Sequence, residues 1–331
     1  MKENLKWVKI IEKCAMNKFF LIKVLFLICI GFVSCSGNDQ PVDHQSSDKQ
    51  KVYVLLLGGQ SNAVGWGYHQ YLLDEKHPLS EAQLDIQLFH ELGGNGYLPD
   101  YTLLPLQSGS ALSEVKPLPN LYPELTVAPI NRFGPELSLG RTVRDRIRDK
   151  DSKFVIIKWA RGGTNLYEQW KADGTANTAS DGIFYKNFQN TVHKGMQAIK
   201  VKYPDYETKI IGMAWVQGES DAIGNQGTKY EENLQRFIND VRVTFGNIPF
   251  VLNKIAPQQI EDTNEQYSQQ WELVRKAQDK VGSSMENVYV TETIGEEYPV
   301  AKGYTELQYH YLSSGLIQIG KDLGNALPID F

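Results

Sequence analysis

The sequence predicts an α/β fold, a three-layer α/β/α sandwich around a central parallel sheet of about five strands. Short apolar runs alternate along the chain with longer segments that carry apolar residues at helical spacing. Strands that alternate with helices are typical of parallel sheets covered on both faces. Right-handed connections between such strands then place helices on each side of the sheet.

Five short runs rich in Val, Ile and Leu are the predicted strands: 51–57, 154–159, 210–216, 249–255 and 288–291. Five segments with apolar residues three and four positions apart are the predicted helices: 136–148, 184–200, 229–245, 265–281 and 312–323. The stretch 66–131 is rich in Pro, Gly, Leu and Tyr and has weak periodicity. We interpret it as a long insertion beside the functional site.

The composition excludes several classes of protein. Hydrophobic residues make up 41% of the 331 residues and charged residues 22%, which is typical of globular proteins and unlike disordered or coiled-coil chains. The net charge is −5, and the folded part of the chain has no basic run. Because phosphate contacts need clustered Lys and Arg, we expect no nucleic-acid partner.

Residues 1–35 resemble the signal peptide of a bacterial lipoprotein. An apolar run at 19–33, interrupted by Lys23, ends at Ser34-Cys35 and is followed by a polar stretch. The run is shorter than the roughly 20 residues of a membrane-spanning helix but suits a signal-peptide core. The resemblance implies that Cys35 is lipidated, becomes the mature N-terminus and anchors the protein in the cell envelope, on the periplasmic or the outer surface. The alternative is an uncleaved anchor helix.

The remaining chain divides into a polar tether at 36–50 and one domain at 51–331. The three cysteines, Cys14, Cys29 and Cys35, all precede the domain, so it has neither a disulfide nor a thiol nucleophile. No pair of histidines has metal-ligand spacing with a partnering carboxylate. We therefore expect no zinc site and no other cofactor.

Polar residues and glycines follow the first three predicted strands, where ligands bind in sheets of this kind. Gly-Gly-Gln-Ser-Asn at 58–62 follows the first strand, Gly-Gly-Thr at 162–164 the second, and Trp-Val-Gln-Gly-Glu-Ser-Asp at 215–221 the third. His310 lies just before the last predicted helix. Taken alone, the first stretch favours a turn in which Ser61 caps a helix over a nucleophile.

In this order the four stretches resemble the SGNH-type esterases. The resemblance is to the carbohydrate acetylesterase branch that includes acetylxylan esterases and sialate O-acetylesterases. Phe-Gly-Pro-Glu-Leu at 133–137 and the region around Tyr185 also match this branch. The resemblance covers roughly residues 51–327. It implies a flavodoxin-like SGNH hydrolase fold and serine-dependent removal of acetyl groups from polysaccharide or glycan.

The resemblance also implies the catalytic roles. Ser61 is the expected nucleophile, and His310 is the expected base that takes its proton. The backbone N–H groups of Ser61 and Gly163 and the side-chain amide of Gln217 are the expected oxyanion donors. Losing one such donor typically costs about 3 kcal/mol of transition-state stabilisation.

One position departs from the family pattern. The family has an Asp three residues before the histidine, where it orients the imidazole, and this chain has Leu307 there. Glu219 or Glu306 is expected to take over this function, with Glu219 slightly preferred, and a backbone carbonyl is a further candidate. A glycan-binding lipoprotein that has lost turnover is the alternative from another functional class.

Substrate contacts are expected from aromatic rings near the catalytic loops, because aromatic faces commonly stack on sugar rings. Trp66 and Trp170 are the candidates. Asn62 is grouped with them, although bracing of the Ser61 loop is its preferred role. The resemblance favours acetylated xylan as the substrate and O-acetylated sialic acid as the second choice.

Overall fold

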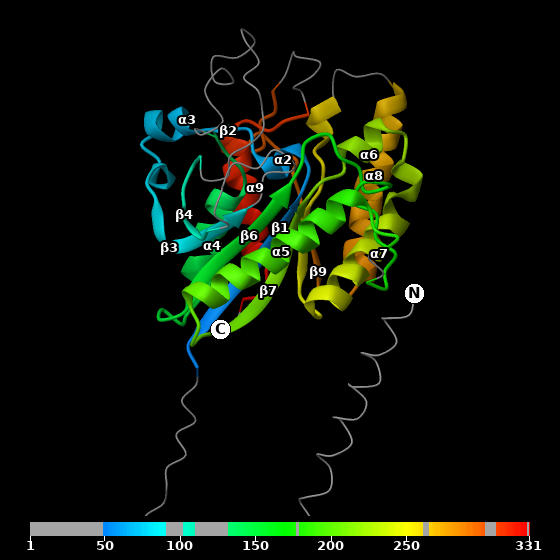
Figure 1. Ribbon diagram of the computed structural model, residues 1–331. Helices are drawn as coiled ribbons and strands as arrows, with labels where there is room; N and C mark the ends of the chain where they lie inside the picture. The colour runs from blue at the N-terminus through cyan, green and yellow to red at the C-terminus, as the bar shows by residue number, and fades with distance from the viewer. Residues whose placement is uncertain are drawn as a thin grey trace, which may run out of the picture. The chain divides into compact units, whose positions relative to one another are not determined.

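The alternation of strands and helices produces the predicted three-layer α/β arrangement in a computed structural model of the protein (Figure 1). The structure describes residues 49–90, 102–109, 132–176, 179–260, 265–301, 309–329 and 331. The central sheet has seven strands in the order β4-β3-β6-β1-β7-β8-β9. These are β1 (Lys51–Gly59), β3 (Gln83–His90), β4 (Leu104–Leu106), β6 (Lys153–Ala160), β7 (Glu207–Val216), β8 (Phe250–Asn253) and β9 (Val288–Thr291). All neighbours are parallel except β3 and β4.

All five predicted strands are confirmed, and the sheet has two more. Both β3 and β4 come from the stretch that we interpreted as an insertion, so that interpretation is wrong for this part of it. β3 pairs in parallel with β6, from Ile86 opposite Phe154 to His90 opposite Lys158. A shorter antiparallel pair, β2 (Gly67–Tyr68) with β5 (Arg132–Phe133), forms a separate sheet.

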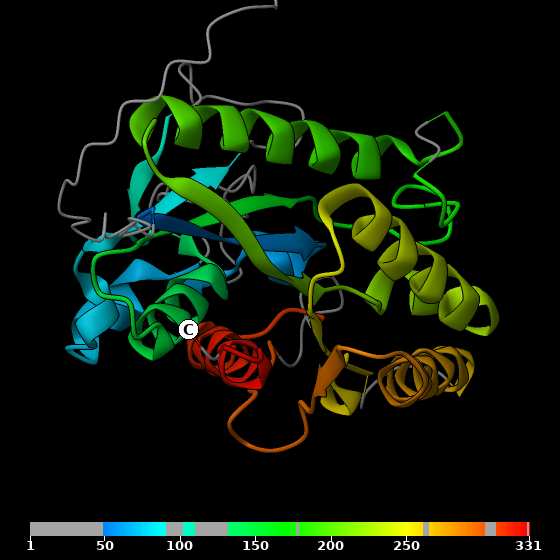
Figure 2. The ribbon, with the colours of Figure 1, turned by 90° about the horizontal axis from the view of Figure 1, so that it is seen from below.

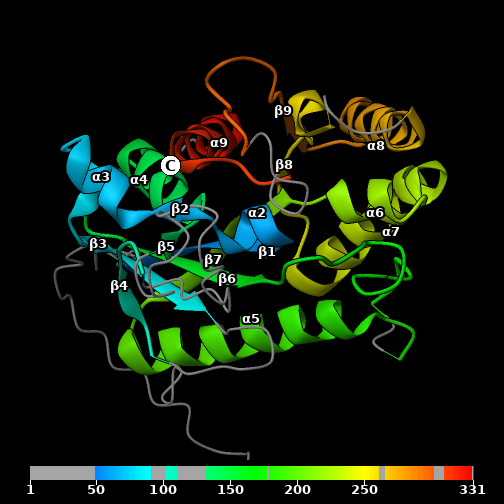
Figure 3. The ribbon, with the colours of Figure 1, turned by 90° about the horizontal axis from the view of Figure 1, so that it is seen from above.

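The five predicted helices are also confirmed, and shorter ones lie in the connections. The long helices are α4 (Glu136–Arg146), α5 (Ile183–Lys202), α7 (Gly227–Phe245), α8 (Glu265–Ser284) and α9 (Ser313–Ala326). The short ones are α2 (Ser61–Val64), α3 (His69–Asp74), α6 (Glu219–Ile223) and the 3₁₀ turns η1 (Pro78–Ser80) and η4 (Pro257–Ile260). Figures 2 and 3 show α5 on one side of the sheet and α4 with α9 on the other.

Alternate residues of β1 explain why the sheet is covered on both faces. Val52, Val54 and Leu56 pack into the core beneath α5, α7 and α8, whereas the intervening residues pack beneath α4 and α9. Each fully buried side chain of this size stabilises the fold by about 1.5–3 kcal/mol. The central strand is therefore buried on both faces, and this packing anchors the start of the loop that follows it.

The predicted signal peptide, the predicted lipidation site Cys35 and most of the predicted tether lie outside the described residues. Among the residues that are described, no helix combines the length and the apolar character needed to cross a membrane.

The three predicted motifs meet at the carboxyl end of the sheet. β1 lies between β6 and β7, and its last residue, Gly59, is opposite Ala160 of β6 and Val216 of β7. The loops that follow these three strands therefore start side by side, above the sheet as it is drawn in Figure 1.

Candidate active site

The turn that carries Ser61 depends on a glycine at the end of β1. Gly59 has a φ of +144°, and a Cβ atom there would overlap the backbone carbonyl oxygen of Val216. Gln60 then donates its backbone N–H to the same carbonyl at 3.0 Å. These constraints turn the chain sharply and place Ser61 at the first position of α2. Ser61 keeps 7% of its surface exposed.

The second motif lies against this turn. A Cβ atom on Gly162 would lie 3.6 Å from Ser61 Cβ, and Arg161 donates its N–H to the Gly59 carbonyl at 3.1 Å. Gly163 has a left-handed φ of +67°, and a Cβ there would have no atom within 4 Å. The backbone of Gly163 thus borders open space beside the Ser61 loop. Its role as an oxyanion donor stays a prediction.

Asn62 connects the Ser61 turn to the loop that carries His310. Its Nδ2 donates to the Tyr309 carbonyl at 2.9 Å, and its Oδ1 accepts the Tyr311 N–H at 3.1 Å. The residues on both sides of His310 are therefore fixed to the residue that follows Ser61. Asn62 is fully buried. The prediction that it contacts substrate is wrong, because no surface of its side chain is left for a sugar.

The ring of Trp66 packs against the imidazole of His310. The two rings stack with centroids 4.2 Å apart and 30° between the planes. The guanidinium of Arg132 lies 5.0 Å from the Trp66 ring centroid. The stacked indole restricts the orientation of the imidazole plane. Trp66 is only partly buried, and its contact with substrate stays a prediction.

Glu219 reaches the histidine loop through two amide side chains. Its Oε1 accepts from Asn62 Nδ2 at 2.6 Å and from Gln259 Nε2 at 3.2 Å. Gln259 in turn donates to the Tyr309 carbonyl at 2.6 Å. Burial raises the pKa of the Glu219 carboxyl, and its hydrogen bonds oppose this shift. The prediction that Glu219 itself orients His310 is therefore corrected. Glu219 binds Asn62 and Gln259, and these two side chains bind the backbone next to His310. Glu306 lies outside the described residues.

Gln217 is a structural side chain. Its Nε2 donates to the Thr164 carbonyl at 3.1 Å and to Asp221 Oδ2 at 2.6 Å, and its Oε1 accepts from the Tyr230 hydroxyl at 3.0 Å. A primary amide has two N–H groups, and both are used here. The prediction that Gln217 donates to an oxyanion is wrong for this arrangement.

Asp221 fastens the loop that follows β6. Its two oxygens accept the backbone N–H groups of Leu166 at 2.8 Å and Tyr167 at 3.0 Å. Burial raises its pKa to about 6. The third motif therefore braces the second, which lies beside Ser61.

Trp170 belongs to the core. It is fully buried, and its indole N–H donates to Thr164 Oγ1 at 3.0 Å. Its ring packs edge-on against Trp159 and Trp215. The prediction that Trp170 contacts carbohydrate is wrong, because the side chain is fully buried among other aromatic rings.

A buried ion pair supports the far end of α2. Lys158 Nζ donates to Glu136 Oε2 at 2.7 Å and to the Val64 carbonyl at 2.8 Å. Glu136 Oε1 also accepts the N–H of Gly134 at 2.8 Å. Burial lowers the pKa of Lys158, whereas Glu136 opposes that shift. This pair explains the Phe-Gly-Pro-Glu-Leu sequence at 133–137: its glutamate neutralises a lysine beneath the Ser61 turn.

Sequence reasoning missed two bracing residues. Gln60 Oε1 accepts the backbone N–H groups of Ser220 at 3.2 Å and Gly218 at 3.5 Å, which ties the first motif to the third. Gln259, on η4, binds both Glu219 and the Tyr309 carbonyl. Gln60 lies inside the first motif, and this position could have indicated a role in the site. The sequence around Gln259 has no such signal.

Comparisons with known proteins agree with the fold. A family model described as carbohydrate esterase, sialic acid-specific acetylesterase, matches residues 49–328. A structure from Arabidopsis thaliana has a TM-score of 0.57 at 18% identity and covers 84% of this chain and 98% of its own. A carbohydrate acetylesterase from Xanthomonas citri has a TM-score of 0.51 at 16% identity and covers 82% of this chain and 55% of its own.

At these identities the two structures show a shared fold. Among curated proteins, none matches the chain in sequence. The family model, in contrast, extends over nearly the whole described domain, and the chain therefore belongs to the carbohydrate esterase family of sialic acid-specific acetylesterases.

Proposed function

We propose that the protein is a serine-dependent carbohydrate O-acetylesterase with Ser61 as nucleophile and His310 as general base. One observation carries the proposal. Asn62, directly after Ser61, hydrogen-bonds the residues on both sides of His310. The family supports the same reaction class.

In the proposed reaction, the imidazole of His310 takes the proton of the Ser61 hydroxyl as Oγ attacks the acetyl carbonyl. The carbonyl oxygen becomes an oxyanion, which the N–H groups of Ser61 and Gly163 stabilise. Collapse of this intermediate expels the sugar oxygen, which takes the proton back from the imidazolium. Water then attacks the acetyl-serine with the same base, and acetate leaves.

We propose that His310 is oriented mainly by its surroundings. Trp66 restricts the ring plane, and the clamp formed by Asn62 and Gln259 fixes the backbone of the loop. Glu306 stays a candidate for a direct partner of the imidazole. An acid that fixes the histidine tautomer can be worth about 10⁴ in rate, so the Glu306→Gln variant separates these cases.

Hydrolysis of p-nitrophenyl acetate tests the nucleophile. We expect Ser61→Ala to abolish acetate release and labelling by an organophosphate, while the surface variant Ser283→Ala keeps both. Comparable rates in Ser61→Ala and wild type would refute the assignment. A protein that binds carbohydrate but shows neither turnover nor labelling would support the binding-protein alternative.

Acetylated polysaccharide or glycan is the proposed substrate, with acetylated xylan first and O-acetylated sialic acid second. The description of the family supports the second choice. Acetate release from acetylxylan and from O-acetylated sialic acid, measured side by side as kcat/KM, decides between them.

We propose that Cys35 carries a lipid and anchors the protein in the cell envelope. The support is the small residue and the cysteine at the end of the apolar run. Metabolic labelling with an alkynyl fatty acid should mark the wild-type chain and the Cys29→Ala variant but not Cys35→Ala. Equal labelling of Cys35→Ala would contradict the proposal.

A further inference from the structure

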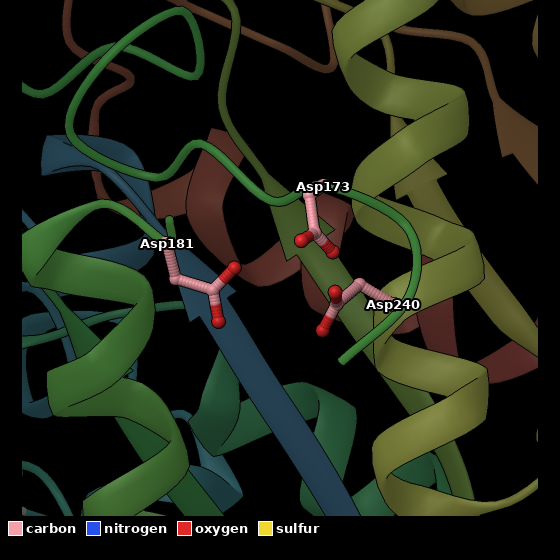
Figure 4. A group of neighbouring side chains, drawn as sticks. All are labelled: Asp173, Asp181 and Asp240. Carbon is pink, nitrogen blue, oxygen red and sulfur yellow. The ribbon is translucent and has the colours of Figure 1, made fainter. Parts of the chain in front are cut away.

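Three aspartates from separate elements converge away from the motifs described above. Asp173 lies in the connection after β6, Asp181 lies just before α5, and Asp240 lies on α7. One carboxylate oxygen of each lies within 4.8 Å of the others. Figure 4 shows the three carboxylates pointing toward one another. Like charges this close repel, so the cluster needs a compensating positive charge or protons.

The surroundings of Asp240 supply hydrogen bonds from neutral groups. The Tyr185 hydroxyl donates to Oδ1 at 2.7 Å, and the Ala176 N–H donates to Oδ2 at 2.8 Å. These donors hold the carboxylate in one orientation, although it is fully buried. The Thr244 hydroxyl also donates to Oδ1, at 3.3 Å, so Oδ2 is the oxygen that retains a lone pair for another partner. A neutral donor does not cancel the charge of a carboxylate.

Asp181 provides independent evidence for a ligand. The residue is 5% exposed, and its Oδ1 is buried without a hydrogen-bond partner among the described residues. The other oxygen accepts from Gln189 Nε2 at 3.3 Å. A buried carboxylate oxygen without a donor, on a side chain that points toward two other carboxylates (Figure 4), is a costly arrangement unless a cation occupies the space between them.

Oxygen ligands of this type select a hard divalent cation. Ca²⁺ binds carboxylate oxygens at about 2.3–2.6 Å, so two ligands of one ion can lie up to about 5 Å apart. The oxygens of the cluster meet that limit. Mg²⁺ demands near-octahedral geometry at about 2.0–2.1 Å, which three carboxylates from separate elements satisfy less readily.

We propose that Asp173, Asp181 and Asp240 bind a structural Ca²⁺ ion. The ion would fasten the connection between β6 and α5 to α7. That connection begins at the loop beside Ser61, so the ion would stabilise the loop from its far end. The proposal does not depend on the esterase reaction.

Calcium titration of EDTA-treated protein tests this. We expect 1 mM CaCl₂ to raise Tm by about 5 °C, as estimated for a ligand well above its Kd in a domain of this size. Calorimetry should give about one ion per chain. Tb³⁺ should show luminescence sensitised through the Tyr185 ring, and Ca²⁺ should displace it.

The variant Asp181→Asn should weaken Ca²⁺ binding at least tenfold and still fold, because an amide keeps the bond to Gln189. The exposed Asp205→Asn, which removes one charge elsewhere, should bind Ca²⁺ like the wild type. Absence of both the Tm shift and displaceable Tb³⁺ luminescence in the wild type would overturn the proposal. So would unchanged Ca²⁺ affinity in Asp181→Asn, or an equal response to Mg²⁺.

Discussion

Replacing Asn62 by alanine tests the clamp that joins the Ser61 turn to the His310 loop. The change removes the bonds from Nδ2 to Glu219 and to the Tyr309 carbonyl, and it removes the acceptor of the Tyr311 N–H. Gln259 still donates to both Glu219 and the Tyr309 carbonyl. The Tyr311 N–H loses the partner that the structure gives it, which costs about 1–3 kcal/mol, and each of the other two lost bonds costs about 1 kcal/mol.

The free energy of unfolding should therefore fall by about 3–5 kcal/mol, which a domain of this size can survive. The loss in kcat should be larger than this loss of stability suggests. Displacing a catalytic group by about 1 Å can cost about 100-fold in rate. We expect kcat for p-nitrophenyl acetate to drop by about that factor with KM nearly unchanged, since Asn62 is buried and does not touch substrate.

Gln83→Ala is the matched control. Gln83 is a buried amide at the start of β3, at the opposite end of the sheet, and it donates to the Leu137 carbonyl at 3.0 Å. The Gln83→Ala variant should have a lower free energy of unfolding, measured in urea, and an unchanged kcat. If Asn62→Ala retained kcat within about threefold at the same loss of stability, the clamp would not position His310.

Four further changes address other parts of the site. Lys158→Met should cost about 3–5 kcal/mol of unfolding free energy in urea, because it strands the buried Glu136 carboxylate, and Lys158→Met/Glu136→Gln should recover most of that loss. Gly59→Ala should reduce kcat strongly and lower Tm, since the added Cβ overlaps backbone; a wild-type rate would contradict the turn geometry. Trp66→Ala should lower kcat and shift the pH profile of kcat/KM, because the imidazole of His310 loses the ring on which it stacks. An unchanged profile would show that this stacking does not affect the reaction. The pKa of Asp221 is raised from 3.8 to about 6, so the folded state takes up a proton as pH falls through 6 while the unfolded carboxyl stays ionised. Its contribution to stability therefore increases by about 1 kcal/mol from pH 7 to pH 5 and is lost again as pH rises, and Asp221→Asn should lack this change in urea titrations.

The main strands and helices could be predicted because their burial follows the sequence pattern. The runs that became β1, β6 and β7 are mostly apolar, as expected for strands covered on both faces, although β6 includes the buried Lys158. β3 could not be recognised in this way. In this outer strand Leu84 is 76% exposed while Gln83 and Gln87 are buried, so polarity and burial run opposite to the usual pattern.

The candidate site could be predicted as a set of loops but not as a set of side-chain directions. Motif order and the expected strand topology were enough to predict that Ser61, Gly163 and His310 lie at one edge of the sheet. The roles of Gln217 and Trp170 were wrong because both side chains turn inward to Thr164, which is a matter of tertiary packing. A local sequence pattern does not indicate which hydrogen-bond partners a buried amide has in the folded protein.

The bond between Asn62 and the Tyr309 carbonyl joins residues 247 positions apart in the chain. A chain still being synthesised has the serine turn long before the histidine loop exists, and so it lacks the partner that completes the clamp. Ester hydrolysis would then begin only once synthesis has passed this loop. Enzymatic turnover can accordingly serve as a reporter of complete folding, and fragments that end before residue 309 should be inert toward cellular esters.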